Sequence, residues 1–89
     1  MRFVWDETKR KNNIKKHGLD FSGAQKVFSG PTFTFEDKRF DYDEQRFITM
    51  GLLDIIVVII AHTETEREMR IISMRKATKD EQKIFFENL

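Results

Sequence analysis

The stretch that decides the fold is Ile55–Lys76, "IIVVIIAHTETEREMRIISMRK". Its first part, residues 55–62, is almost continuously apolar and mostly β-branched, which predicts a central strand buried on both faces. The polar segment Thr63–Glu66 predicts a turn, and a last strand follows it. This last strand ends in two cations, Arg75 and Lys76. Two cations at the end of such an apolar strand either face solvent or belong to a functional site.

The segments around this stretch predict the rest of an antiparallel sheet. Thr32–Phe35 and Arg46–Gly51 are predicted strands because apolar and polar residues alternate there. Together with Ile55–His62 and Glu68–Arg75 they form a four-stranded antiparallel meander. Phe3–Trp5 is a short apolar lead-in that could add an edge strand.

Two helices are predicted ahead of the strands. Asp6 can cap the first helix, which runs to His17 and ends at Gly18. Asp20 can cap the second helix, and Gly30-Pro31 ends it. Apolar residues recur at helical spacing in the second helix and are expected to bury one face: Phe21, Ala24, Val27 and Phe28.

A third helix is predicted after the sheet. Thr78–Glu81 matches a capping box, in which the Thr hydroxyl and the Glu carboxylate each satisfy a free backbone amide. This helix is expected to bury Ile84, Phe85 and Leu89. The predicted fold is therefore α+β, with two N-terminal helices, a four-stranded antiparallel sheet and a C-terminal helix, in a single domain over residues 1–89.

Composition narrows the class of protein. Hydrophobic residues make up 39% and charged residues 35% of the 89 residues, which is typical of a globular chain. There is no cysteine, which fits a reducing compartment. The longest apolar run, Ile55–Ala61, is too short to cross a bilayer. We therefore expect a soluble, cytoplasmic protein without a membrane partner.

The charges are segregated along the chain although the net charge is only +1. Residues 9–16 carry five cations and no acid, and residues 67–79 carry five cations against one acid. Residues 36–44 carry five acids against two cations. Each block alone is most simply a solvated face. If the two basic blocks converged on one surface, they would form a phosphate-binding footprint.

The residue types that are present limit the possible chemistry. The chain has no glycine-rich phosphate loop, no Cys/His metal pattern and no Gly-x-Ser-x-Gly elbow, so neither a metal nor another cofactor is predicted. Arg, Lys, His and carboxylate side chains remain. They suffice for RNA cleavage by attack of the 2′-hydroxyl, which needs a base, an acid and cations around the phosphorane.

The predicted meander does not assemble one compact site. His62 lies near the turn between the last two strands, closer to Arg70 than to Arg75. Arg46 begins the preceding strand, so Arg46 and His62 could share one edge, with Arg75 and Lys76 at the opposite end. The simpler alternative for His62 is a hydrogen-bonded strand-end histidine.

Simpler alternatives also stand for two other residues. Arg70 could be the cross-strand partner of an acid such as Glu64 or Glu44. His17 could serve only as a C-terminal helix residue favoured by the helix dipole.

Several motifs together resemble the BrnT family of bacterial toxins, in the right order over nearly the whole chain. They are Phe3–Asp6, Asn13–Gly18, Phe21 with Ala24 and Val27-Phe28, Asp41–Ile48 followed by Gly51, His62-Thr63, and Arg70–Thr78. The resemblance implies a ribonuclease toxin of a type II toxin–antitoxin system with a RelE-like fold, which inhibits translation. It also implies a cognate antitoxin with a ribbon-helix-helix region, through which alone the toxin would reach promoter DNA.

The sequence departs from the family pattern at three places. Asp43 stands where Gly is frequent, and Met74 where Ala is common. The connection Leu52–Asp54 is shorter than the Gly/Asp-rich turn of many members. A turn and a strand tolerate the first two changes, and the third alters only the hairpin.

The resemblance and the chemistry together suggest roles for eight residues. Arg46 and Arg75 are expected to contact phosphate and stabilise transition-state charge, with His62 as acid or base. Glu44 is expected to orient Arg46 or to act as a base. The residues expected to extend the RNA surface are Lys16, His17, Arg70 and Lys76.

Two other functions remain open at this point. The chain could be a non-catalytic module that holds its antitoxin and takes part in transcriptional autoregulation. A metal-dependent nuclease is disfavoured, because no acidic cluster has clear ligand spacing and the acids of Asp41–Glu44 fall in a predicted loop.

Overall fold

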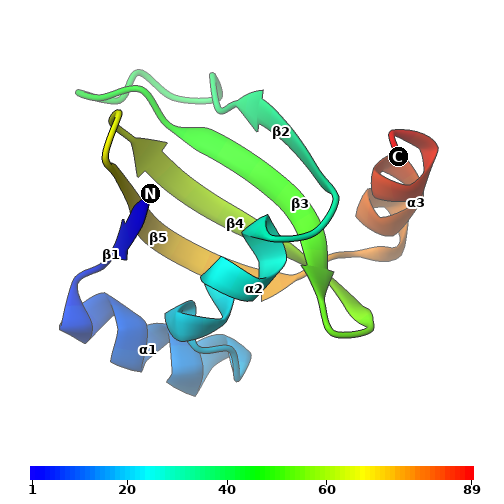
Figure 1. Cartoon of the computed structure of the whole chain (residues 1–89), viewed down its shortest axis with the longest axis horizontal. Coiled ribbons are helices and arrows are strands. Elements are labelled where there is room, and N and C mark those ends of the chain that lie inside the picture. Colours follow the sequence, from blue (N-terminus) through cyan, green and yellow to red (C-terminus); the bar gives the residue numbers. More distant parts are fainter.

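Five strands form one mixed sheet in the order β1-β5-β4-β3-β2 in the computed structural model, which describes residues 1–89 (Figure 1). Three α-helices and one 3₁₀ turn complete the fold. In chain order the elements are β1 (Arg2–Val4), α1 (Glu7–His17), η1 (Phe21–Gly23), α2 (Ala24–Phe28), β2 (Thr32–Glu36), β3 (Phe47–Leu53), β4 (Ile56–Glu64), β5 (Glu68–Lys76) and α3 (Lys79–Glu87).

The α+β class is confirmed, but the sheet differs from the predicted four-stranded antiparallel one. β2, β3, β4 and β5 do form the predicted meander. The short lead-in adds β1, which pairs parallel to β5 with Phe3 opposite Met69. A three-residue strand that pairs with a segment more than sixty residues away leaves no local pattern. The sequence could therefore indicate only its possibility.

Local end signals determine where the helices begin and end. The Asp6 carboxylate accepts a hydrogen bond from the Lys9 backbone N–H at 2.9 Å, and Gly18 closes α1 with φ of 71°. The capping box of Thr78 and Glu81 is formed at the start of α3. The predicted second helix is shorter than expected, because it opens as the 3₁₀ turn η1 and α2 has only five residues.

The sheet has two covered faces. α1, η1 and α2 pack on the first, the α1–α2 face, over a core cluster of Leu19, Phe21, Ala24, Val27, Val58, Ile60, Met69, Ile71 and Met74. The opposite α3 face is covered only in part, by Phe85 of α3, which packs with Ile48, Met50, Val57 and Ile59. α3 stands at one end of the sheet, well away from α1 and α2 (Figure 1). The remainder of the α3 face is therefore not covered by a helix.

Asn13 protects the part of the β5 edge that β1 is too short to cover. Its side-chain amide donates to the Met74 carbonyl at 2.9 Å and accepts from the Met74 N–H at 3.1 Å. The same amide nitrogen donates to the Leu19 carbonyl at 3.0 Å. The buried side chain thus replaces the hydrogen bonds of an absent neighbouring strand.

Three residues predicted to be buried are exposed. Ile55 is 95% exposed, because the chain turns at Asp54 with φ of 55° and β4 begins only at Ile56. In α3, Ile84 and Leu89 are 42% and 66% exposed. A nine-residue helix that meets the sheet through one buried ring cannot bury all three apolar residues. None of the helices has the length and apolarity that crossing a membrane requires.

Candidate functional site

His62 lies inside the protein, on the α1–α2 face. Its side chain is fully buried, with the ring edge-on to Phe28 and stacked on Phe47. Its Nε2 is 2.7 Å from the Thr49 hydroxyl oxygen, which is in turn 2.7 Å from the Thr34 hydroxyl. His62, the predicted acid or base, is therefore buried in the core. The simpler alternative, a hydrogen-bonded histidine of the strand, describes its environment.

Burial also fixes the charge state of this ring. Desolvation lowers the pKa of His62 to about 4, so the imidazole is neutral at pH 7. Its Nδ1 makes no hydrogen bond, and the nearest carboxylate oxygen, Glu64 Oε1, is 3.5 Å away.

The predicted arginines lie on the other side of the sheet. Arg75 is opposite Ile59 of the α3-face cluster. Arg70 lies between Met69 and Ile71, which both point into the α1–α2 core, so alternation directs Arg70 to the α3 face.

Arg46 and Lys76 are assigned to faces by the same alternation. Arg46 precedes Phe47, whose ring stacks on His62, so Arg46 belongs on the α3 face. Arg46 and His62 do lie at the same end of the sheet, as expected, because Phe47 pairs with His62, but their side chains are on opposite faces. Arg75 lies further along β4, opposite Ile59, on the same face as Arg46. Lys76 is opposite Val58 of the α1–α2 core, so it points away from Arg75.

Arg75 is held by the first turn of α3. Its Nη1 and Nη2 donate to the two carboxylate oxygens of Glu81 at 2.7 and 2.8 Å. This contact lowers the pKa of Glu81 to about 2 and raises the pKa of Arg75. Glu81 also accepts from the Thr78 N–H, so one carboxylate both caps α3 and orients the arginine.

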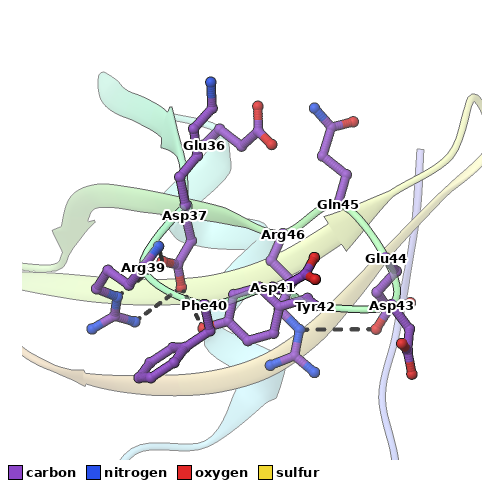
Figure 2. A pocket seen from close by; sticks show the side chains of 11 residues that line it. Glu36, Asp37, Arg39, Phe40, Asp41, Tyr42, Asp43, Glu44, Gln45 and Arg46 are labelled. Atoms are coloured by element: carbon purple, nitrogen blue, oxygen red, sulfur yellow. Dashed lines mark hydrogen bonds and ion pairs between the residues drawn. The ribbon is translucent and has the colours of Figure 1, made fainter.

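Arg39 is a site residue that the sequence did not reveal. Its Nε and Nη2 each donate to the Asp37 carboxylate at 2.9 Å, and the Tyr42 hydroxyl donates to the same carboxylate at 3.0 Å (Figure 2). The bidentate contact with Arg39 holds the pKa of the buried Asp37 far below its usual range. The positive charge of Arg39 also acts on the pKa of Arg75, opposing the effect of Glu81. Arg39 stood within the acidic block, where no local signal set it apart.

Glu44 connects the other two arginines. It forms an ion pair with Arg70, and its Oε1 is 4.0 Å from the Arg46 Nε. The alternative that pairs Arg70 with Glu44 is confirmed. The Arg46 guanidinium stacks on the Tyr42 ring at 4.2 Å, and its buried Nε has no hydrogen-bond partner (Figure 2). The loop that carries these groups, residues 36–46, lines a polar hollow of about 510 Å³.

A second hollow, of about 280 Å³, lies between this loop and α3. We call it the sheet-face hollow. Arg39, Arg75 and Glu81 stand around it, and Phe35 and Ser73 also line it. The remaining lining residues are apolar side chains of β3 and β4, namely Ile48, Met50, Ile59 and Ala61.

The first basic block lies beside β5. A third hollow is lined by Lys9, Lys16 and His17 from α1 together with Ile72 and Ser73, among others. Ser73 lines both this hollow and the sheet-face hollow, so the two adjoin. Lys16 and His17 therefore lie on a surface that continues towards Arg75. No three histidine, cysteine or carboxylate side chains are grouped as ligands for a metal ion.

Comparison with known proteins defines the class. A family model described as "Ribonuclease toxin, BrnT, of type II toxin-antitoxin system" matches residues 5–81. The chain therefore belongs to the BrnT family, as its motifs indicated. It is similar to the crystal structure of the Brucella abortus ribonuclease toxin BrnT, with 29% sequence identity and a TM-score of 0.65. That match covers 89% of this chain and 99% of the other. A search of the curated proteins finds no match.

Proposed function

We propose that this BrnT-family chain is an endoribonuclease toxin that cleaves RNA on the α3 face by attack of a 2′-hydroxyl. One observation carries the proposal: Arg39, Arg46, Arg70 and Arg75 gather on the part of this face that α3 leaves open. Guanidinium groups are suited to hold a phosphate and to stabilise the charge that develops on the phosphorane.

The arginines keep donors free although each lies near a carboxylate. A guanidinium has five N–H donors. Glu81 uses the end of the Arg75 fork, Nη1 and Nη2, which leaves its Nε side open to a phosphate. Asp37 uses the Nε side of Arg39, which leaves its Nη1 open. These carboxylates orient the two arginines and leave some of their N–H donors free.

Among the nearby carboxylates, Glu44 is the proposed general base. Arg75 holds the pKa of Glu81 at about 2, and Arg39 holds the pKa of Asp37 far below its usual range, so both are poor proton acceptors near neutral pH. Glu44 stands between Arg46 and Arg70 with its side chain partly exposed. The buried His62 has no part in proton transfer in this proposal, and the leaving 5′ oxygen takes its proton from water at the exposed site.

The proposed RNA path extends from the arginines past Ser73 to Lys16 and His17. Lys76 has no part in it, because it lies on the opposite face. A ribbon-helix-helix antitoxin would neutralise the toxin by covering the arginines. Promoter DNA would be contacted only through that antitoxin, and inhibition of translation would follow from cleavage of the RNA.

The test is cleavage of naked RNA in the presence of a chelator by wild type, Arg75→Ala, Arg39→Ala and Lys76→Ala. We expect wild type and Lys76→Ala to cleave and the two arginine variants to lose at least about tenfold in rate. Circular dichroism checks that each variant is folded. The site assignment fails if both arginine variants are folded and keep full activity.

A wild type that cleaves neither naked RNA nor RNA on translating ribosomes would contradict the enzyme proposal. It would favour the second candidate, a non-catalytic module that binds the antitoxin. Exposed aromatic residues favour that candidate, since Phe40 is 67% and Phe86 54% exposed. Under that candidate their replacement by Ala would weaken antitoxin binding more than loss of the arginines.

A further inference from the structure

The sheet-face hollow is more apolar than a phosphate site requires. Five of its nine lining residues are hydrophobic, and its floor is formed by apolar side chains of β3 and β4. A phosphate group is bound through hydrogen-bond donors and gains nothing from an apolar surface. The apolar part of the hollow therefore calls for a ligand with a flat, weakly polar surface next to its charge.

We propose that the sheet-face hollow binds one unpaired nucleobase of the RNA, next to the phosphate that Arg75 and Arg39 hold. The inference rests on the proposed function, since it names a further contact of the same substrate at the same site. Single-stranded RNA offers splayed bases that stack on aromatic side chains and expose their edges to hydrogen-bonding groups.

Phe35 supplies the aromatic surface. Its side chain lines the hollow and is 41% exposed, although it belongs to a strand. The neighbouring ring of Phe33 supports it, with 5.7 Å between ring centroids. Such a partly exposed ring beside two cations is a stacking platform for a base.

Polar groups are available to contact the edge of the base. The Ser73 hydroxyl lines the hollow and makes no hydrogen bond within the protein, so it can donate or accept. Arg39 keeps its Nη1 free, and Arg75 keeps its Nε free. The hollow thus combines an apolar floor, an aromatic wall and unused donors.

Charge favours a nucleotide over an apolar side chain of a protein partner. Two guanidinium groups with open donors border the hollow, and an apolar side chain would leave them without an anion. A nucleotide supplies the anion and the flat ring within one unit. Insertion of an antitoxin side chain is the alternative that the experiment must separate.

The experiment uses a labelled nine-nucleotide single-stranded RNA with 2′-fluoro sugars, which cannot be cleaved by 2′-hydroxyl attack. A second set of probes carries one abasic residue at each position in turn. For wild type, we expect one abasic position to weaken binding about tenfold, because the phosphates remain while the stacking is lost. Phe35→Ala should bind the intact probe about tenfold more weakly and show no further loss at that position.

Two variants control for indirect effects. Phe40→Ala removes a more exposed ring that does not line the hollow, and it should keep the full abasic penalty. Phe35→Leu preserves apolar contact with Phe33 but not the aromatic face, so it should behave as Phe35→Ala while staying folded. Arg75→Ala should weaken every probe alike.

Distinct results overturn the two proposals. If no abasic position weakens binding, or if Phe35→Ala keeps the penalty, the base site is wrong while arginine-dependent cleavage can stand. If Phe35→Ala instead weakens only antitoxin binding, the hollow accepts a protein side chain and the base site is again wrong. If Arg75→Ala binds all probes as tightly as wild type, the proposed RNA site itself fails.

Discussion

At the scale of single residues, His62 shows that a titratable side chain in a strand can be part of the buried core. Its ring is neutral when folded, because burial lowers its pKa from 6.5 to about 4. Between these values the unfolded chain binds a proton that the folded chain does not. Stability is therefore complete above about pH 6.5 and falls as the pH drops towards 4.

The first prediction follows from this linkage. From pH 7 to pH 5 the free energy of unfolding should fall by about 2 kcal/mol through His62. His62→Gln, which keeps an amide to bond Thr49, should remove most of this pH dependence. Urea denaturation of wild type and His62→Gln at the two pH values measures it. An unchanged pH dependence in His62→Gln would contradict the assignment.

Glu81 carries the second prediction at this scale. Glu81→Gln keeps a capping group for the Thr78 N–H but removes the negative charge that orients Arg75. The rate constant for RNA cleavage should fall roughly tenfold to a hundredfold, because a misplaced catalytic group is costly. Single-turnover cleavage with saturating enzyme measures this rate constant.

Thr78→Ala is the matched control for Glu81. It should cost about 1 kcal/mol of stability through the lost cap and leave cleavage unchanged. Equal losses of activity in the two variants would mean that α3 stability, and not the orientation of Arg75, sets the rate.

At the scale of elements, the sequence predicts what local signals determine. The cap of Asp6, the left-handed Gly18 and the capping box of α3 lie within a few residues of their partners, and all are formed. For β1 the sequence indicates only a possible strand, because its pairing with β5 depends on a distant segment. The antiparallel meander was predictable since each strand pairs with its neighbour in the chain.

The candidate site was predictable only in part, for a related reason. Alternation assigns a side chain to a face only where one face is polar, and β4 is buried on both faces. The orientation of His62 was therefore undetermined from the sequence, and a register irregularity at Ala61/His62 adds to this. Arg39 is brought near Arg75 only by the path of the loop between β2 and β3. Local composition does not encode that path.

Asn13 gives the element-scale prediction, because it joins α1 to the open edge of β5. Asn13→Ala would leave the buried N–H and C=O of Met74 without partners, which should cost about 2–4 kcal/mol of stability. Asn12→Ala, at the exposed neighbouring position, should change stability by no more than about 0.5 kcal/mol. Urea denaturation of both variants decides, and a small effect of Asn13→Ala would show that α1 does not depend on this edge contact.

At the scale of the whole molecule, a near-neutral chain gathers arginines on one face of its sheet. Four arginines on the α3 face stand against three carboxylates, Asp37, Glu44 and Glu81, so little net charge attracts RNA from a distance. The donors that remain free on Arg39 and Arg75 point to recognition at contact range. Lys16 of α1, past Ser73 of β5, is the cation that would extend RNA contact beyond this face.

The last prediction is the salt dependence of binding to an uncleavable single-stranded RNA. About three phosphate contacts, from Arg75, Arg39 and Lys16, should give a slope of about −2 for log affinity against log salt concentration. Lys16→Ala should make the slope shallower by about 0.7, which corresponds to one lost contact. Lys76→Ala should leave the slope unchanged, because its side chain points to the opposite face. Equal changes in the two variants would mean that RNA is attracted by total charge and does not follow the proposed path from the α3 face past Ser73 to α1.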